Sequence, residues 1–391
     1  MSLDERYVRK ANEIDAALRR ALGGVVAAPR RHDAFNNAYH LCDANLRYFF
    51  PHLSRERRDE VIAEVLFLQN MAVLDQKQYD LVETTRLDDL AGIVSGGRQT
   101  GGHIFCTYHT GSYRHLFHFL LRAGTECVLF LAGNTLNKQG QDILDVAQDA
   151  ARARGWTGTL RTVNAQDRNS VLFGLRALKR GASLVIYIDG NAGVGSNKES
   201  GSMVPVRFFG QHIMARAGIA YLSHLARVPV VPVVCRRDAT HALSLTFHPP
   251  IVPTGDDREQ YAADTTQALY SLLEQSVADA PGQWEGWLYV ERYLQRSTDV
   301  RPAARTSEES AAELRADTDR FALLLYGDQP VLLDKARHSC IMLDPASADV
   351  FRTAVERPSA RDALDLSNAR IRKLIDVGAL TRAETAEPRA G

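Results

Sequence analysis

The spacing of hydrophobic positions changes twice along the chain. Up to residue 92, apolar side chains recur every three or four residues, as on one face of a helix. Pro51 interrupts this pattern, and Ser54 behind it is a typical helix N-cap. Between residues 101 and 250, continuous runs of Val, Ile, Leu and Phe alternate with stretches of helical spacing. The first region therefore predicts helices, and the second predicts strands that alternate with helices.

The second region has the pattern of a covered parallel sheet. The predicted strands are 103–108, 127–132, 159–163, 184–189, 228–235 and 243–247, and the predicted helices are 114–122, 138–154, 167–179 and 215–226. Apolar strands that alternate with amphipathic helices are typical of the α/β class, so we expect a mostly parallel central sheet flanked by helices. Right-handed crossovers would bring the carboxyl ends of the strands to one edge.

A third region follows the sheet. Residues 321–326 and 331–334 predict two strands around a Gly-Asp-Gln-Pro turn, and helical spacing returns at 346–355 and 371–377. The predicted domain order is a helical N-terminal region (1–95), an α/β domain (96–298), a linker (299–318), a small C-terminal domain (319–381) and a flexible tail (382–391). In the helical region, Asn36, Asn37 and Asn45 are expected on the helix surface.

The strand pattern places two candidate catalytic residues at one edge of the sheet. His109 ends the first predicted strand, and a Thr-Gly-Ser turn leads from it into a helix. Open α/β sheets bind ligands at this edge, where a neutral imidazole could act as a general base. The alternative is a structural histidine bonded to the turn. Asp189 ends the fourth predicted strand, so we expect it at the same edge.

Candidate substrate-binding residues lie close to these two in the sequence. Arg114 could bind an anionic group or belong to a buried ion pair. Arg207 lies in an apolar run, where an arginine usually needs an anionic partner. The glycine-rich segment 190–202 lacks the Lys-Ser/Thr of a P-loop and is either a substrate-covering loop or disordered. The candidate binding residues are Ser112, Tyr113, Arg114, Asn191, Arg207, Phe209 and Gly210.

Composition narrows the function classes. Among 391 residues, 47 are Lys or Arg and 47 are Asp or Glu, so no net charge attracts the chain to nucleic acid or anionic lipid. The five cysteines have no metal-ligand spacing, which predicts reduced thiols in a cytoplasmic protein and no metal site. No apolar stretch approaches 18 residues, so no transmembrane segment is expected. No cofactor is predicted.

Four sequence blocks follow one another through the α/β region. They are His-Thr-Gly-Ser-Tyr-Arg at 109–114, Tyr-Ile-Asp-Gly-Asn at 187–191, Val-Pro-Val-Arg-Phe-Phe-Gly at 204–210 with Ala-Gly-Ile-Ala at 217–220, and Pro-Gly-Gln-Trp-Glu-Gly-Trp at 281–287. Together they resemble the lipid A-type lauroyl/myristoyl acyltransferase family, over roughly residues 30 to 295. The resemblance implies a lysophospholipid acyltransferase-like fold. It also implies that His109 activates an acceptor, which attacks an acyl thioester on acyl carrier protein or coenzyme A.

One position departs from the pattern of that family. The family carries Asp or Glu five residues after the histidine, where the carboxylate orients the imidazole, and this chain carries Arg114. An arginine cannot accept the imidazole N–H. Either another group orients His109, with Asp189 the first candidate, or the chemistry has changed.

The C-terminal domain carries a second resemblance. Its blocks are Phe-Ala-Leu-Leu-Leu-Tyr at 321–326, Val-Leu-Leu-Asp at 331–334, Leu-Asp-Pro-Ala-Ser-Ala at 343–348 and Leu-Ile-Asp-Val-Gly-Ala-Leu at 374–380. Residues 319–381 thereby resemble PqqD-type domains, which are small winged-helix-like modules. Such modules bind peptides by strand addition, which implies a peptide or carrier contact here. The alternative is a domain that serves dimerisation or packing.

Three functions remain open from the sequence. The first is an acyltransferase of specialised metabolism that uses a thioester donor and His109 as general base. The second is an aminoacyl-tRNA-dependent transferase with an amine or hydroxylamine acceptor, in which Arg114, Arg207 and Arg216 could meet phosphates, although the balanced net charge does not favour it. The third is a non-catalytic relative that binds a carrier or a peptide.

Overall fold

The computed structural model describes residues 3–27, 34–90, 92–93, 102–190, 203–294, 314–356 and 369–382. The chain divides into two compact units, and each unit is formed by several segments. Unit 1 comprises Met1–Leu18, Ala63–Gly286 and Arg292–Gln295, and unit 2 comprises Arg19–Ile62, Trp287–Glu291 and Arg296–Gly391. The helices α1 (Glu5–Ala27) and α3 (Arg55–Gln76) have residues in both units. Among the described residues, no helix has both the length and the apolar character to cross a lipid bilayer.

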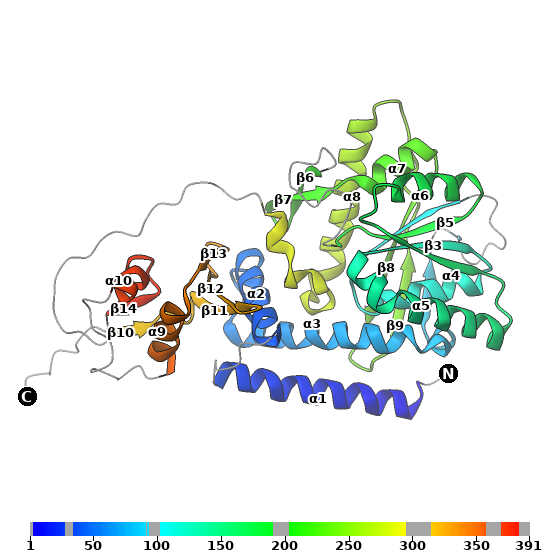
Figure 1. The fold of residues 1–391 in the computed structure, drawn as a ribbon. Helices are drawn as coiled ribbons and strands as arrows, with labels where there is room; N and C mark the ends of the chain where they lie inside the picture. The colour runs from blue at the N-terminus through cyan, green and yellow to red at the C-terminus, as the bar shows by residue number, and fades with distance from the viewer. Residues whose placement is uncertain are drawn as a thin grey trace, which may run out of the picture. The chain divides into compact units, whose positions relative to one another are not determined.

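Unit 1 contains a seven-stranded sheet with the order β1-β9-β8-β2-β5-β3-β4 (Figure 1). Its strands are β1 (Arg86–Asp89), β2 (Ile104–Thr107), β3 (Glu126–Leu131), β4 (Thr159–Asn164), β5 (Ser183–Tyr187), β8 (Val230–Arg237) and β9 (Leu243–Phe247). All neighbouring pairs are parallel except β8 with β9. The prediction of a mostly parallel α/β sheet is confirmed.

Strand β1 lies inside the region that the sequence predicts to be helical. Its residues, Arg-Leu-Asp-Asp, form no apolar run, and none of them is fully buried. The segment is a strand because its backbone pairs in parallel with β9 at the edge of the sheet. Hydrophobic spacing cannot reveal a strand that is held only by its neighbour.

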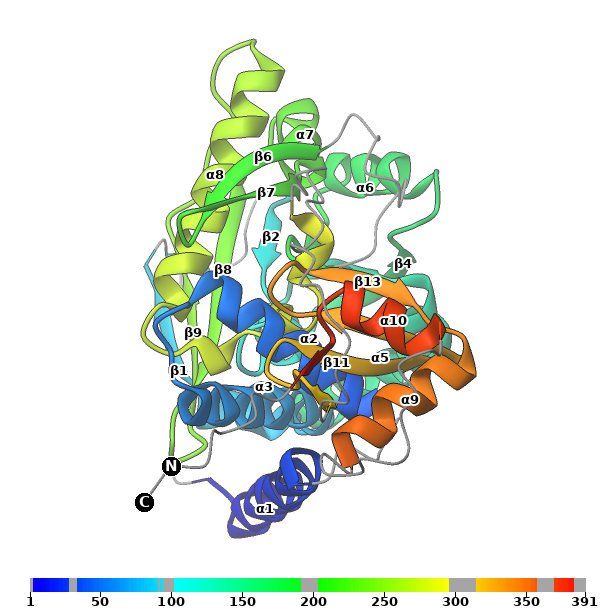
Figure 2. The same cartoon turned by 90° about the vertical axis from the view of Figure 1, so that its left-hand side faces the viewer.

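Helices cover both faces of this sheet (Figure 2). They are α4 (Leu116–Arg122), α5 (Gly133–Arg154), α6 (Ser170–Lys179), α7 (Gly218–Ala226) and α8 (Arg258–Val277), with short 3₁₀ turns η1 (Tyr79–Glu83), η2 (Tyr113–His115), η3 (Pro281–Gln283), η4 (Glu285–Leu288) and η5 (Val290–Tyr293). Apolar residues of α4 and α5 form one core with Phe105, Leu129 and Val231 of the sheet. Burial of these side chains fixes the strands whose carboxyl ends carry the candidate site.

The apolar segment after the glycine-rich region is a β-hairpin. It consists of β6 (Met203–Phe208) and β7 (Gln211–Arg216), which pair in antiparallel register. The two turn residues, Phe209 and Gly210, have φ angles of 47° and 75°. Two positive φ angles are typical of the type I′ turn of a tight hairpin, in which glycine is favoured at the second position. The hairpin packs on α8.

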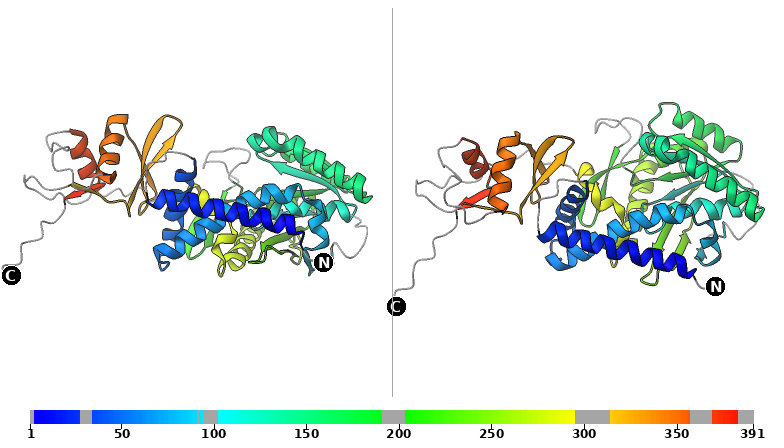
Figure 3. Two further views of the ribbon diagram at one scale, coloured as in Figure 1. Left: turned by 90° about the horizontal axis from the view of Figure 1, so that it is seen from below. Right: turned by 60° about the horizontal axis from the view of Figure 1, so that its bottom comes forward.

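Unit 2 contains helix α2 (Ala34–Phe49) and the C-terminal domain. The domain has a three-stranded antiparallel sheet of β11 (Phe321–Tyr326), β12 (Gln329–Asp334) and β13 (Ser339–Met342), the helices α9 (Pro345–Glu356) and α10 (Ala369–Asp376), and the strand pair β10 (Leu314–Ala316) with β14 (Leu380–Arg382). Figure 3 shows α9 between the three-stranded sheet and α10. The predicted strand pair and both helices are confirmed.

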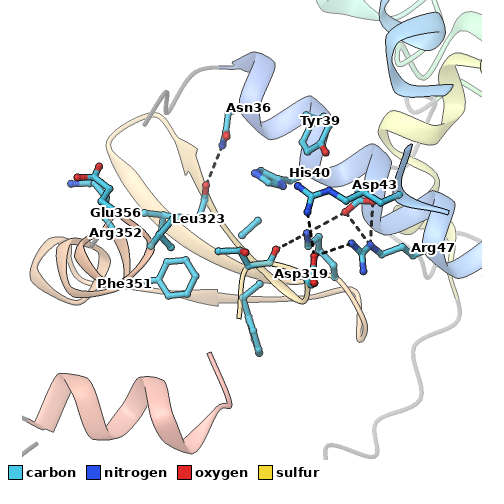
Figure 4. Close-up of a pocket in the computed structure, with 16 residues that line it drawn as sticks. Asn36, Tyr39, His40, Asp43, Arg47, Asp319, Leu323, Phe351, Arg352 and Glu356 are labelled. Atoms are coloured by element: carbon cyan, nitrogen blue, oxygen red, sulfur yellow. Dashed lines mark hydrogen bonds and ion pairs between the residues drawn. The ribbon is translucent and has the colours of Figure 1, made fainter. Parts of the chain in front are cut away.

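The asparagines of α2 bind backbone groups instead of solvent, and two of them bind the edge of β11. The Asn36 side chain donates to the carbonyl of Leu323 at 3.2 Å (Figure 4), and the Asn37 side chain both donates to and accepts from the backbone of Leu325. Asn45 is fully buried and donates to the carbonyl of Trp287 at 2.7 Å. The expectation of surface positions is therefore wrong, because these amides satisfy backbone groups of unit 2.

Candidate active site

His109 and Asp189 meet at the carboxyl edge of the sheet. Each lies two residues beyond the end of its strand, β2 for His109 and β5 for Asp189. Because these strands are adjacent and parallel, both side chains reach the same edge. Nδ1 of His109 lies 2.9 Å from Oδ1 of Asp189, and the backbone N–H of His109 donates to Oδ2 at 2.9 Å. The carboxylate can only accept, so Nδ1 carries the hydrogen.

Asp189 accepts a third hydrogen bond from Trp284, which lies 95 positions later in the chain. The carboxylate is 1 % exposed, and the indole N–H of Trp284 donates to Oδ2 at 2.6 Å. The ring of Trp284 packs edge-on against Phe208 of the hairpin, with 5.2 Å between centroids. Trp284 lies in the sequence block at 281–287, and its place in that block does not reveal the hydrogen bond.

The imidazole of His109 lies between two tyrosine rings. The centroids of Tyr113 and Tyr187 each lie 4.7 Å from it, and 19 % of the His109 side chain remains exposed to an incoming reactant. Burial by itself lowers the pKa of His109, but the adjacent carboxylate of Asp189 and the more distant one of Glu285 raise the pKa above its usual value. When the imidazole is neutral, the lone pair lies on Nε2, which can accept a proton.

Glu285 is a site residue that the sequence reasoning missed. Its backbone N–H donates to the carbonyl of His109 at 2.9 Å. Its carboxylate accepts from the hydroxyl of Tyr113 at 3.1 Å and from the side chain of Gln69 at 3.0 Å. The sequence block at 281–287 contains Glu285 next to Trp284. This block was the sequence feature that could have indicated Glu285 as a site residue. Tyr113, a predicted binding residue, links Glu285 to the face of the imidazole.

Arg114 points toward two glutamines. Its guanidinium donates to the amide oxygens of Gln76, at 3.0 Å, and of Gln139, and Nε donates to the hydroxyl of Tyr113 at 3.4 Å. No carboxylate in the described part of the chain forms an ion pair with it. The half-buried charge therefore has neutral partners, which differs from the buried ion pair that was one alternative.

Ser112 is part of a buried ionic network behind the turn. The residue has no exposed surface, and its hydroxyl donates to Asp75. Asp75 also accepts from Arg237 and from the hydroxyl of Tyr7, and all these side chains are buried. This network anchors the turn that follows His109. A direct contact of Ser112 with substrate does not follow from this position.

The hairpin candidates bond to residues of helix α8. Arg207 is exposed on β6, and its backbone N–H and carbonyl bond to the side chain of Gln267. The expected anionic partner of Arg207 is not found among the residues that the structure describes. Phe209 and Gly210 form the hairpin turn, where the N–H of Phe209 donates to Glu274 at 2.8 Å. Asn191 lies outside the described residues.

Comparisons with known proteins gave one family match and one similar structure. Residues 151–293 match the family of bacterial lipid A biosynthesis acyltransferases, a span that includes Asp189 and Trp284 and begins after His109. A comparison with curated proteins gave no match. Among solved structures, the chain is similar to the 1-acyl-sn-glycerophosphate (LPA) acyltransferase PlsC from Thermotoga maritima, with 12 % identity, coverage of 67 % of this chain and 97 % of that chain, and a TM-score of 0.30. The family match over this part of the chain supports an acyltransferase activity.

Proposed function

We propose that the protein transfers an acyl group from a thioester of acyl carrier protein or coenzyme A to a hydroxyl or amine. In this proposal, His109 is the general base and Asp189 orients it. The observation that carries the proposal is the 2.9 Å hydrogen bond between Nδ1 of His109 and Asp189 at the carboxyl edge of the sheet. Asp189 supplies the carboxylate that the family keeps five residues after the histidine, where this chain has Arg114.

In the proposed reaction, His109 is both the base and the acid, and Asp189 supports it. Nε2 of His109 removes the proton from the acceptor as its oxygen or nitrogen attacks the thioester carbonyl carbon. The carbon–sulfur bond then breaks, and an ester or amide forms. The proton on Nε2 passes to the departing thiolate, which leaves as a thiol. Asp189 stabilises the imidazolium between the two proton transfers.

Arg114 is the proposed contact for an anionic part of a substrate. Its guanidinium is held by Gln76 and Gln139, which carry no charge to neutralise it. A phosphate or carboxylate of the donor or acceptor would form charge-assisted hydrogen bonds there. For Asn191, Arg207, Phe209 and Gly210, substrate binding stays a prediction.

For the C-terminal domain we retain a peptide or carrier contact as part of the proposal. Within the described part of the chain, strand β13 pairs only with β12, so it is an edge of the three-stranded sheet. The opposite edge, β11, is bound by Asn36 and Asn37. Strand addition by a peptide is therefore better supported at β13.

The test combines substrate screening with one matched pair of variants. Purified protein is incubated with acyl-carrier, acyl-coenzyme A and aminoacyl-tRNA donors and a panel of acceptors, and products are identified by mass. His109→Ala should lower kcat by about 10²- to 10⁴-fold. His212→Ala, which removes an exposed histidine of β7, should leave kcat unchanged. Equal rates for both variants would refute His109 as the base, and turnover only with aminoacyl-tRNA would replace the thioester donor.

A further inference from the structure

Unit 2 contains a cavity that the proposed reaction does not use. It lies between α2, β11 and α9, and its volume is about 210 Å³ (Figure 4). All residues of its lining belong to unit 2, whereas His109 and Asp189 belong to unit 1. An apolar cavity of about 150 Å³ is large enough to bind benzene, so this one can hold a small organic molecule.

Part of the cavity wall is apolar. Its aromatic and aliphatic residues are Tyr39 of α2, Phe321 and Leu323 of β11, and Phe351 and Val355 of α9. Phe321 and Phe351 are fixed by the core of the C-terminal domain, in which both are buried. Figure 4 shows Leu323 and Phe351 apart from Arg47 and Asp43. The cavity therefore has an apolar side, which suits a ring or a short alkyl chain, and a charged side.

Three basic side chains share one carboxylate at the charged side. Arg47 and Lys335, which line the cavity, lie 3.0 Å and 3.1 Å from Asp43, and Arg58 lies 2.7 Å from it. Burial lowers the pKa of Lys335, and Arg47 lowers it further, while Asp43 only partly opposes both. Positive charge is therefore in excess around this carboxylate.

Arg55 brings another cation to the same side. It shares Asp319 with Arg47, at distances of 3.7 Å and 3.9 Å, and the side chain of Asp319 is 75 % exposed. Ion pairs of this length at an exposed carboxylate contribute little to stability. The guanidinium of Arg55 can therefore turn to an anion in the cavity at little cost.

His40 contributes a buried polar atom to the lining. Its Nδ1 is inaccessible to solvent and has no hydrogen-bond partner in the part of the chain that the structure describes. Burial and the charge of Lys335 lower the pKa of His40 to about 3, so the imidazole is neutral. Buried polar atoms are rarely left without a partner, and a carboxylate oxygen can accept from an N–H at this position. A bound anion would supply the missing partner.

We propose that this cavity binds a small organic monoanion, a carboxylate attached to a ring or to a short alkyl chain. The carboxylate would bind Arg55 and Arg47, and the apolar body would lie against Leu323 and Phe351. Four basic and three acidic side chains line the cavity, so a single negative charge balances them. A phosphate ion lacks the apolar body and carries more charge. This inference does not depend on the proposed acyl transfer.

The test compares carboxylates with neutral molecules of similar shape. Binding of benzoate and hexanoate to the full-length protein is measured by ligand-observed NMR, with benzyl alcohol, 1-hexanol and inorganic phosphate in parallel. At least one carboxylate should bind saturably and about tenfold or more tightly than its alcohol, and phosphate should not bind. Equal binding of acid and alcohol, or binding of phosphate alone, would overturn the proposal.

Variants locate the bound carboxylate. Arg55→Gln should weaken its binding by about tenfold, because one charge-assisted hydrogen bond is lost. The matched control is Arg57→Gln, which removes the same group two positions along α3, at a side chain that is 48 % exposed against 52 % for Arg55 and does not line the cavity. This control should bind like wild type. Val355→Trp should fill the cavity and abolish binding, with urea denaturation showing that the variant is folded.

A further variant separates this site from the candidate active site. His109→Ala should bind the carboxylate like wild type, because His109 belongs to the other unit. Loss of binding in His109→Ala, or unchanged binding in both Arg55→Gln and Val355→Trp, would overturn the proposal. Acyl transfer without carboxylate binding would refute the cavity proposal alone. Carboxylate binding without acyl transfer from any donor would refute the proposed function alone.

Discussion

Two buried aspartates of this protein, Asp43 and Asp189, have different electrostatic surroundings. Asp43 of α2, in unit 2, accepts from Arg58 at 2.7 Å, from Arg47 at 3.0 Å and from Lys335 at 3.1 Å. Asp189, in unit 1, accepts from a backbone N–H, an indole N–H and an imidazole. Burial raises the pKa of Asp43, but Lys335 and Arg47 lower it more, to about 2. Both carboxylates are nearly inaccessible to solvent.

Under the proposed reaction, this difference separates a structural carboxylate, Asp43, from one that takes part in the chemistry, Asp189. The charge of Asp43 is compensated by basic side chains, among them Lys335 of the C-terminal domain, so it locks α2 to that domain within unit 2 (Figure 4). The charge of Asp189 has one titratable partner, His109, and its compensation changes whenever the imidazole gains or loses a proton. Burial alone therefore does not identify a catalytic aspartate. The partners do.

The largest expected effect is on catalysis at Asp189. Asp189→Asn keeps the shape of the side chain but removes the charge that stabilises the imidazolium. We expect kcat to fall on the order of 10²- to 10⁴-fold with little change in the free energy of unfolding. Steady-state rates and urea denaturation measure both quantities. A large loss of stability with unchanged kcat would assign Asp189 to the structural class.

The reverse result is expected for Asp43. Asp43→Asn leaves the buried charges of Lys335 and Arg58 without their carboxylate, so the free energy of unfolding should fall by about 3–5 kcal/mol. Urea denaturation measures this loss. Asp319→Asn is the control, because the Asp319 side chain is 75 % exposed in its ion pairs with Arg47 and Arg55 and should contribute less than about 1 kcal/mol. Equal effects of the two substitutions would contradict a buried structural role of Asp43.

A smaller effect is expected from the third donor to Asp189. Trp284→Phe keeps the packing on Phe208 but removes the indole hydrogen bond to the carboxylate. Loss of a hydrogen bond to a charged group costs about 1.5–3 kcal/mol, and we expect kcat to fall by about tenfold. Trp156→Phe, at a partly buried position that packs against the core, should leave kcat unchanged. An equal kcat in Trp284→Phe and wild type would show that the indole contributes only packing and that its hydrogen bond to Asp189 does not support catalysis.

The smallest expected effect is on the pH dependence of the rate. A general base must be neutral, and the pKa of His109 is raised, so kcat/KM should fall on the acid side at a higher pH than for an ordinary histidine. Removing the carboxylate in Asp189→Asn lowers this pKa and should move the acid limb to lower pH. Glu285→Gln should move it in the same direction by less, because Glu285 acts from a greater distance. A limb that stays in place in Asp189→Asn would show that another group titrates.

Periodic features of the chain were predictable because they depend on neighbours in sequence. Six apolar runs and four helical stretches predicted the strands β2, β3, β4, β5, β8 and β9 and the helices between them. The parallel pairing that these elements require brings His109 and Asp189 to one edge, so this pair could be placed before the structure. The resemblance blocks added the acyltransferase assignment, which the family match supports.

Only the tertiary structure decided which side chains meet. Trp284 reaches Asp189 across 95 positions of the chain and Glu285 reaches Tyr113 across 172, and no local pattern predicts such contacts. Arg114 turns to Gln76 and Gln139 because helices distant in sequence place amide oxygens there. A hydrophobic period reports which face of an element is buried, since burial acts on each residue through its own surface. A hydrogen bond needs two particular atoms within about 3 Å, and for residues far apart in sequence only the folded chain sets that distance.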